Sequence, residues 1–340
     1  MSRDRVVSTA EETPQEESAN VALRPARIAE YIGQPELIER LSIALEAVQG
    51  RGEPMEHVLL HGPPGLGKTT LAHVIANEMG SRAYVTSGPA LTKGGDLIGT
   101  LTRLEPRDVL FIDEIHRLPV AVEEYIYPAM EDFRVDFTVD SGLHARTVTI
   151  NLQPFTLIGA TTRAGLLTQP LRSRFGIAHH LGFYGVDDLS TILRRAAKLL
   201  GIAPPAEVER LIAERSRGTP RIALRLLRRV RDFAQVRAGG TLDVDVVEAA
   251  LALEGIDRLG LDELDRKYLR TLAGVYEGGP AGLEAIAASM GDDAATLEDL
   301  VEPYLLQLGF LARTRQGRML TPAAKEHLGL PAADAAGDLF

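Results

Sequence analysis

Short apolar runs and longer amphipathic stretches alternate along residues 23–184 of this chain. Continuously apolar runs are typical of strands that are buried on both faces of a parallel sheet. The stretches between them carry apolar residues at helical spacing, which indicates right-handed βαβ crossovers and an α/β domain with a doubly wound parallel sheet. The strands are expected at residues 58–61, 82–86, 109–112, 155–159 and 179–181.

Residues 134–150 break this rhythm, because polar and apolar residues alternate there on both sides of Ser141-Gly142. Such alternation around a short turn predicts a β-hairpin inserted into the α/β domain. Two interpretations remain open for it. It is either an ordinary edge hairpin or a protruding arm whose apolar face binds a partner.

The pattern becomes purely helical after residue 187 and changes again after residue 260. Helices are expected at 189–200, 206–215, 221–237 and 244–253, and then at 261–275, 283–290 and 294–308. Residues 310–320 read as two short strands around a tight turn, and three helices followed by a hairpin predict a winged helix. We therefore expect a disordered tail at 1–20, a large α/β domain at 21–184, a small all-helical domain at 185–257 and a winged-helix domain at 258–340.

The composition of the chain sets bounds on its class. The 340 residues are 45% hydrophobic and 25% charged, which is ordinary for a globular protein. No apolar run approaches the roughly 20 residues that cross a bilayer, and there is no apolar signal region, so a cytoplasmic protein without a membrane partner is expected. The absence of cysteine excludes disulfides and thiolate metal sites. The net charge of −10 argues against indiscriminate binding to nucleic acid but allows a local basic patch.

The stretch Gly62-Pro63-Pro64-Gly65-Leu66-Gly67-Lys68-Thr69-Thr70 matches the phosphate-loop pattern G-x-x-x-x-G-K-[ST] in full. It lies between a predicted strand and a predicted helix, as a cradle of backbone N–H groups for the phosphates of ATP requires. In such a loop Lys68 reaches the β- and γ-phosphates, and the Thr69 hydroxyl holds Mg²⁺. The alternative is a Gly/Pro-rich turn that binds no ligand.

An acidic pair follows the apolar run at residues 109–112. Asp113 would complete the Mg²⁺ shell, and Glu114 would orient or deprotonate the attacking water. The alternative is a strand that merely ends in two acids. A further strand is followed by Thr161-Thr162, whose hydroxyls either polarise the water near the γ-phosphate or cap the next turn.

Arginines in two later segments are candidates for contact with the γ-phosphate. Leu171-Arg172-Ser173-Arg174-Phe175-Gly176 carries two of them, and Arg221 follows Gly218-Thr219-Pro220 at the start of a helix. A guanidinium stabilises transition-state charge, often from a neighbouring subunit. The alternative in both places is surface charge or a salt bridge.

Taken in order, these segments resemble the AAA+ ATPases, and they resemble most closely the RuvB family of bacterial Holliday-junction branch-migration motors. The resemblance also rests on Leu23-Arg24-Pro25, on Tyr31-Ile32-Gly33-Gln34 and on residues 111–118, 159–165 and 172–176. It runs from about Leu23 to Leu330. It implies an AAA+ domain, a helical lid and a winged helix. The implied enzyme hydrolyses ATP to translocate duplex DNA, which drives branch migration of Holliday junctions in recombination and repair.

The resemblance also implies which residues bind the nucleotide. Leu23, Arg24 and Tyr184 would line the adenine pocket, and Glu131-Asp132-Phe133 would be a further nucleotide-contacting segment. These roles do not follow from spacing or composition.

Three roles in hydrolysis are implied in the same way. Thr162 would be the first sensor, with Thr161 as the near alternative. Arg174 would be the arginine finger that acts on the next subunit, and Arg221 would be the second sensor.

The resemblance implies partners as well. Members of the family assemble as hexameric rings around duplex DNA, in pairs that flank a junction bound by the protein RuvA. The hairpin at residues 134–150 would dock on RuvA, and the resolvase RuvC would join the larger complex.

The expected DNA contact is the wing at residues 310–320, because Arg313, Arg315 and Arg318 make it locally basic. The helix that would usually enter the major groove carries Glu298 and Glu302, with Asp299 beside them, and phosphates would repel these carboxylates. Arg313 and Arg318 align with DNA-contacting positions of the family. Phosphate contacts position a protein without reading sequence. The alternative is a plain solvated hairpin.

Other functions are compatible with some of these features. A clamp-loader-type AAA+ assembly factor is the main alternative to a motor, although the winged helix and the missing cysteines disfavour its bacterial form. An ATP-switched DNA-binding regulator and a protein-unfolding machine are less well supported, because Glu114 and Arg174 favour turnover and the arginine-rich wing favours DNA.

Overall fold

The computed structural model describes residues 21–138 and 147–330. These residues fall into two compact units, 21–188 and 189–330, and each is described by itself. The tail expected at residues 1–20 lies outside the described residues. Among the residues that are described, every helix is too short or too polar to serve as a transmembrane segment.

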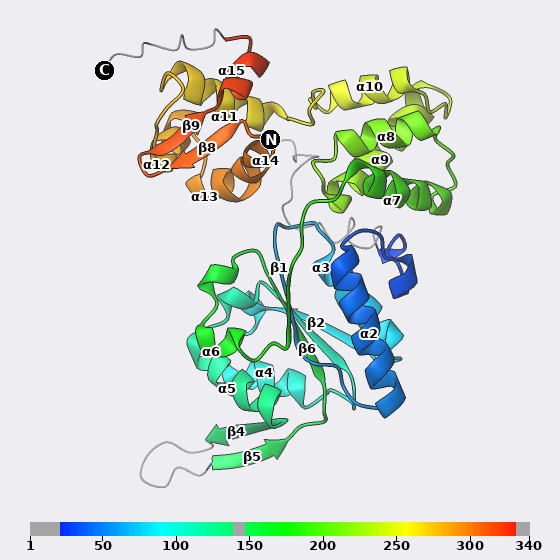
Figure 1. Cartoon of the computed structure of the whole chain (residues 1–340), viewed down its shortest axis with the longest axis vertical. Helices are drawn as coiled ribbons and strands as arrows, with labels where there is room; N and C mark the ends of the chain where they lie inside the picture. The colour runs from blue at the N-terminus through cyan, green and yellow to red at the C-terminus, as the bar shows by residue number, and fades with distance from the viewer. Residues whose placement is uncertain (1–20, 139–146, 331–340) are drawn as a thin grey trace. The chain divides into compact units, whose positions relative to one another are not determined.

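The first unit is built on a parallel five-stranded sheet (Figure 1), as the apolar runs predicted. The strand order is β2-β3-β6-β1-β7, with β1 in register with β6 through Leu59 and Gly159. The strands are β1 (Val58–His61), β2 (Ala83–Ser87), β3 (Val109–Asp113), β6 (Thr156–Thr161) and β7 (Ile177–His180). β7 begins earlier than expected, because as an edge strand it alternates half-buried and exposed residues and gives a weak apolar signal.

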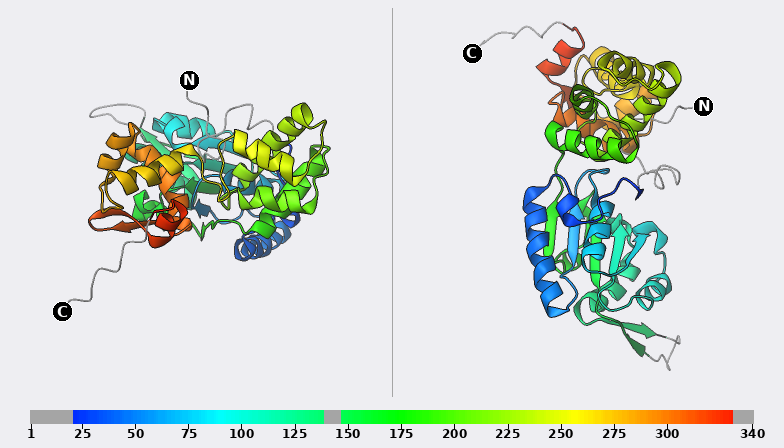
Figure 2. Two further views of the ribbon diagram at one scale, coloured as in Figure 1. Left: turned by 90° about the horizontal axis from the view of Figure 1, so that it is seen from above. Right: turned by 90° about the vertical axis from the view of Figure 1, so that its right-hand side faces the viewer.

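Helices cover both faces of this sheet, with α2 on one side and the α4 and α5 segments on the other in the right-hand view of Figure 2. The helices are α2 (Pro35–Arg51), α3 (Lys68–Glu78), α4 (Gly94–Leu101), α5 (Val120–Glu131) and α6 (Gln169–Arg172). Short 3₁₀ turns are η1 (Ile28–Glu30), η2 (Gly88–Ala90), η3 (Ile115–Arg117) and η4 (Ala164–Leu166). β6 is buried throughout and β1 is buried except at His61, and burial of apolar surface at about 25 cal/mol per Å² holds the layers together.

An antiparallel pair, β4 (Arg134–Thr138) and β5 (Thr147–Asn151), lies apart from the main sheet where a hairpin was expected. Val135 faces Ile150, and Phe137 faces Val148, so these four side chains share one face of the pair. Val135 is buried, whereas Phe137 and Val148 remain 37% and 45% exposed. The turn expected around Ser141-Gly142 lies outside the described residues.

The second unit begins with the helical lid. Its helices are α7 (Val186–Leu199), which starts in the connection from the first unit, α8 (Ala206–Glu214), α9 (Pro220–Arg237) and α10 (Val244–Leu253). Their apolar faces pack on one another, as helical spacing of the apolar residues predicted.

The winged helix follows in the same unit. Its elements are α11 (Glu263–Gly274), α12 (Leu283–Met290), α13 (Ala294–Thr296), the π-helical turn η5 (Leu297–Val301), α14 (Glu302–Gln307), β8 (Leu311–Thr314), β9 (Gly317–Leu320) and α15 (Pro322–His327). The third helix was expected to be continuous over 294–308, but η5 interrupts it. Pro303 explains the break, because it has no N–H to donate to the carbonyl of Asp299.

Buried arginines join the lid to the winged helix just before α9. The Arg217 side chain is 3% exposed, forms an ion pair with Asp265 and donates from Nε to the Gly260 carbonyl at 2.8 Å. Its guanidinium also lies over the ring of Tyr304, 4.9 Å from the centroid. A buried charge with these partners holds the two parts in one arrangement, because separation would leave Asp265 unpaired.

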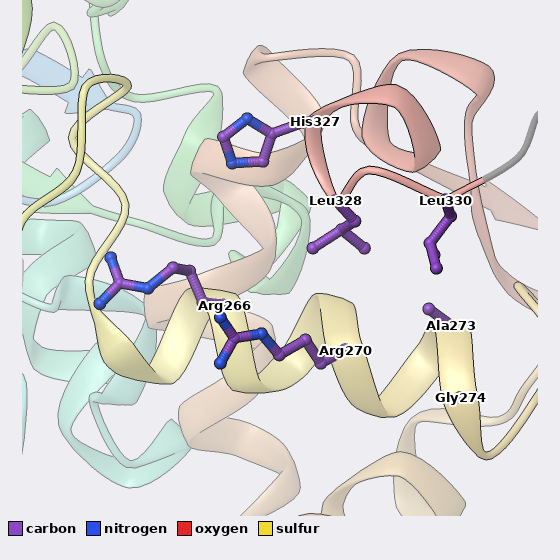
Figure 3. Close-up of a pocket in the computed structure, with 7 residues that line it drawn as sticks. All are labelled: Arg266, Arg270, Ala273, Gly274, His327, Leu328 and Leu330. Carbon is purple, nitrogen blue, oxygen red and sulfur yellow. The ribbon is translucent and has the colours of Figure 1, made fainter.

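A pocket of about 300 Å³ opens between α11 and the end of α15 (Figure 3). Arg266 and Arg270 line it from α11, and His327 lines it from α15. Arg266 already donates to the carbonyls of Leu261 and Gly255, at 2.7 and 2.8 Å. The pocket therefore belongs to the packing of α15 on the winged helix.

Candidate nucleotide and nucleic-acid sites

The phosphate loop joins the carboxyl end of β1 to the first turn of α3. Gly62, Gly65 and Gly67 have φ values of 138°, 79° and 97°, a region that favours glycine. A Cβ on Gly67 would lie 2.7 Å from the Tyr31 hydroxyl, and one on Gly62 would lie 2.5 Å from a backbone oxygen. Only glycine fits at these two positions, so the backbone amides of the loop remain accessible to a phosphate.

Lys68 is the first residue of α3 and is 7% exposed. Its ammonium donates to the carbonyls of Gly62 and Pro63, both at 2.9 Å. Thr69 and Thr70 follow in the first helical turn and are half-buried. A helix N-terminus, a cradle of amides and a positioned ammonium together fit the phosphates of a nucleotide.

Two tyrosines fix the loop from outside. The Tyr184 hydroxyl donates to the Leu66 carbonyl at 3.2 Å and lies 3.0 Å from the Tyr31 hydroxyl. Because Tyr184 has given its one hydrogen to Leu66, Tyr31 must be the donor in the second bond. Burial raises the pKa of Tyr184 to about 12 and also raises the pKa of Tyr31, so both hydroxyl hydrogens stay in place at neutral pH.

The segment before α2 completes this support. The Gln34 side chain donates to the Gly182 carbonyl at 2.7 Å and accepts from its N–H at 3.3 Å. A Cβ on Gly33 would lie 2.4 Å from the Tyr184 ring. The sequence marked this segment only as a family motif, and it gave no sign that Tyr31 and Gln34 hold the phosphate loop.

Leu23 and Arg24, expected at the adenine pocket, begin the segment that leads to Tyr31. Leu23 is buried and Arg24 is half-buried. Contacts of Ala26 and Ile28 with the end of α3 place this segment beside the helix that carries Lys68.

Glu114 lies just beyond β3 in a left-handed conformation with φ of 47°. The Thr162 hydroxyl donates to its carboxylate at 3.4 Å, and His116 Nε2 lies 3.3 Å from the same oxygen. Thr161 instead contacts His116 Nδ1 at 2.8 Å. The geometry therefore brings Thr162, and not Thr161, to Glu114. His116 was missed, because a histidine on a short turn gives no signal of its contacts.

Burial and the neighbouring charge of Asp113 raise the pKa of the Glu114 carboxyl, although Lys68 and the hydrogen bond from Thr162 act against this. A carboxylate with a raised pKa is a better proton acceptor at neutral pH. Asp113 ends β3, and one of its oxygens accepts the Glu114 N–H at 2.9 Å. Its second oxygen can serve a cation.

Arg174 and Glu131 lie at the edge of the sheet formed by the amino ends of its strands. The phosphate loop lies at the other edge, formed by the carboxyl ends. Arg174 comes just before β7, and the residue before Glu131 bonds through its carbonyl to His57 Nε2, which precedes β1. The phosphate loop follows the other end of β1. Four strand residues at about 3.3 Å each separate these edges by about 13 Å.

In this chain Arg174 rests on its own subunit. Its Nε lies 3.1 Å from Glu131 Oε1, one terminal nitrogen donates to the Pro170 carbonyl at 2.6 Å, and the guanidinium stacks over Tyr127 at 4.4 Å. Asp132 pairs with Arg134 at 3.2 Å, beside the same edge. The three-residue segment expected to contact nucleotide thus lies beside Arg174, the expected finger, and away from Lys68.

Phe133 packs edge-to-face on Phe155 at the amino end of β6, which places it at this edge too. Arg221 occupies the first turn of α9 in the second unit.

The wing is a tight hairpin in which Arg313 and Arg318 are directly opposite. Arg315 lies in the exposed turn between β8 and β9. The Arg313 Nε donates to Glu302 Oε2 at 2.7 Å, and the Arg318 Nε donates to Glu302 Oε1 at 2.9 Å. Tyr268 donates to the same carboxylate at 2.8 Å.

This arrangement corrects one expectation from the sequence. Glu302 was expected to face DNA and repel phosphates, but its side chain is 0% exposed. Acids on a helix are usually solvated, so the sequence alone favours an exposed position. Here two guanidiniums and a tyrosine hydroxyl satisfy the carboxylate inside the domain. Glu302 is therefore a buried partner of the wing arginines and does not face DNA.

Family models match almost the whole chain. Residues 23–181 match the Holliday junction DNA helicase RuvB P-loop domain. Residues 184–257 match the RuvB AAA lid domain, and residues 258–329 match the RuvB C-terminal winged helix domain.

Solved structures give the same result. The Thermotoga maritima RuvB Holliday junction branch migration motor is 52% identical, with a TM-score of 0.82 over 91% of this chain and 99% of that chain. One single-residue mutant of that protein gives 52% identity and a TM-score of 0.84 over 91% of this chain and 99% of its own. A second single-residue mutant gives 53% identity and a TM-score of 0.83 over 91% of this chain and 98% of its own.

These findings confirm the predicted fold class and set aside the clamp-loader alternative. A phosphate-loop ATPase domain, a helical lid and a winged helix occur here in the order of the family models. The chain therefore belongs to the RuvB family, the P-loop ATPase helicases that drive branch migration at Holliday junctions.

Proposed function

We propose that this protein hydrolyses ATP at seams between identical subunits of a hexameric ring and uses the cycle to move duplex DNA in the cytoplasm. The observation that carries this proposal is the separation of Arg174 from the phosphate loop of its own chain. The two lie at opposite edges of one sheet. A finger so placed can reach only the nucleotide of a neighbouring subunit.

The neighbour's site would be completed by more than the finger. Glu131-Asp132-Phe133 lies at the same sheet edge as Arg174, which supports a nucleotide contact made across the seam. On binding, Arg174 would exchange Glu131 and the carbonyl of Pro170 for phosphate oxygens. Its stacking on Tyr127 would keep the side chain directed outward.

Within one subunit, the phosphate loop binds and orients the triphosphate. Its amides and Lys68 would contact the phosphates, and Leu23, Arg24 and Tyr184 would enclose the base. Glu114 would accept a proton from the attacking water, and the Thr162 hydroxyl would hydrogen-bond to both the Glu114 carboxylate and that water. Arg221 would approach the phosphates from the lid as the second sensor.

The same residues fit a magnesium ion. Thr69 and Asp113 offer a hydroxyl and a carboxylate oxygen, which are ligands that Mg²⁺ accepts. Mg²⁺ would neutralise charge on the β- and γ-phosphates when bound. Among the described residues, no group of three or more histidine, aspartate or glutamate side chains is arranged to hold a metal ion.

Two surfaces would contact other molecules. The exposed pair Phe137 and Val148 on the hairpin at 134–150 supports docking on RuvA, and RuvC would join the larger complex. On the winged helix, Arg313, Arg315 and Arg318 would contact the duplex backbone. In this proposal the ATPase domain spans residues 21–184, the helical lid 185–257 and the winged helix 258–340.

Mixing two inactive variants tests the seam. Lys68→Ala removes the phosphate contact of a subunit, and Arg174→Ala removes the finger that it offers. Rings containing both variants should regain part of the ATPase rate, because some seams then combine an intact loop with an intact finger. Co-purification of one variant, untagged, with the other, tagged, must show that mixed rings form. Mixed rings without any regained turnover would show that Arg174 does not act across the seam.

A further inference from the structure

The wing places two like charges face to face. Arg313 and Arg318 are cross-strand partners, so their side chains lie on the same face of the hairpin. Like charges in this position destabilise a hairpin unless a counter-charge lies between them. Glu302 is that counter-charge. It is fully buried and accepts hydrogen bonds from both guanidiniums and from Tyr268.

A second carboxylate reaches the same arginines from the surface. Glu298 lies four residues before Glu302, on the same side of the helical turn. One oxygen of Glu298 lies 3.5 Å from Arg318 Nη2 and 3.9 Å from Arg313 Nη1. Its side chain is 40% exposed, compared with 0% for Glu302.

These two carboxylates differ in how easily an incoming anion can displace them from the arginines. Glu302 makes short, aligned hydrogen bonds in a buried position, so removing it would strand two charges. Glu298 makes long contacts at the surface, where an ion pair contributes little and salt screens it. Arg313 Nη1, which lies 3.9 Å from Glu298, is on a side chain that is 42% exposed. An incoming anion would therefore meet the guanidiniums on the side that Glu298 now occupies.

We propose that Glu298 competes with the phosphodiester of duplex DNA for Arg313 and Arg318, while Glu302 holds both guanidiniums in place. This inference rests on the proposed function, in which the wing contacts the DNA backbone. Two guanidiniums face two carboxylates in the free wing, so the cluster carries no net charge. A phosphate that leaves is replaced by Glu298, so the two arginines keep two anionic partners and release of the phosphate costs less free energy. A motor that must release DNA in every cycle needs this property.

The test is binding of the full-length protein to a fluorescent duplex of arbitrary sequence, measured across a series of KCl concentrations. Glu298→Gln keeps the shape of the side chain and removes its charge. Glu326→Gln on α15 is the control, because it removes one exposed acid of the same domain. Glu298→Gln should bind about fivefold more tightly than the control at 0.1 M salt, the upper range for one exposed ion pair. The KCl concentration at which half of the duplex is released should also be higher for Glu298→Gln than for the control. Affinity equal to that of the control would overturn the proposal.

A second background separates this inference from the proposed function. The double variant Arg313→Ala/Arg318→Ala should weaken DNA binding, and adding Glu298→Gln should then change affinity no more than Glu326→Gln does. If the double variant binds DNA as the native chain does, contact by the wing itself is wrong. If it binds weakly but Glu298→Gln alone gains nothing, contact stands and competition is wrong. A gain that persists without the arginines would mean that Glu298 acts as general surface charge, which also refutes competition.

Discussion

The phosphate loop and the wing are both suited to bind phosphate, yet they are built in different ways. In the loop, backbone amides and an ammonium held by two main-chain carbonyls face the ligand, and glycine is required where a Cβ would collide. In the wing, side-chain guanidiniums are held by two carboxylates, one buried and one exposed. Main-chain donors cannot move aside, whereas a surface carboxylate can return when the ligand leaves.

This difference suits the two ligands. ATP must stay bound and oriented through a chemical step, so fixed donors that need no reorganisation favour the reaction. Duplex DNA must be held and then released, so a contact that is balanced by an internal anion is an advantage. Arg174, the proposed finger, resembles the wing in this respect, because it is held by Glu131 on its own chain and would exchange that partner at a neighbouring subunit.

The largest expected effect is at the fixed site. Glu114→Gln removes the proton acceptor while keeping shape and position, so turnover should fall by about 10² to 10⁴. ATP affinity should change little, since in the proposed mechanism Glu114 contacts the attacking water and not a phosphate. The measurement is steady-state ATPase rate together with binding of a fluorescent nucleotide. Near-native turnover would remove Glu114 from the mechanism.

The buried anion of the wing should matter for stability. Glu302→Gln leaves two opposed arginines with only the surface carboxylate of Glu298. Loss of one partner from a fully buried pair costs about 3–5 kcal/mol, and the cost here should be lower because Arg313 is 42% exposed. Hydrogen exchange of the wing amides reports this locally, with Glu326→Gln as control. Unchanged protection of β8 and β9 would show that Glu302 does not anchor the wing.

Removing the wing arginines should affect all DNA sequences alike. The variant Arg313→Ala/Arg318→Ala should flatten the plot of log affinity against log salt by about 0.9 for each lost contact. Binding to several unrelated duplexes is compared across salt concentrations. A strong dependence on sequence would contradict contact with the backbone alone.

The smallest expected effect is a shift in pH dependence. The hydrogen bond from Thr162 lowers the pKa of Glu114, so Thr162→Val should raise that pKa further. Glu114 acts only when deprotonated, and the acidic limb of kcat/KM should therefore move to higher pH. Thr161→Val, which alters the contact with His116, serves as the comparison. An acidic limb that moves only in Thr161→Val would reverse the assignment of the sensor.

The sequence predicted the loop better than the wing for a physical reason. Phosphate contacts of the loop come from consecutive residues, so the pattern from Gly62 to Thr70 is legible without tertiary structure. Glu302 depends on the packing of α14 against the hairpin, and a charged residue on a helix gives no sign of burial. Tyr31 and Gln34 likewise act on a loop that lies distant in sequence.

The central claim is that one molecule holds two kinds of phosphate by two physically different devices. Its most direct test is to measure nucleotide and duplex binding by the same protein between 50 and 200 mM KCl. Two wing contacts alone predict about a tenfold loss of DNA affinity over this range. Nucleotide affinity should change much less, because buried contacts are weakly screened. If the two affinities fall in parallel, the distinction between the fixed cradle and the exchangeable wing is wrong.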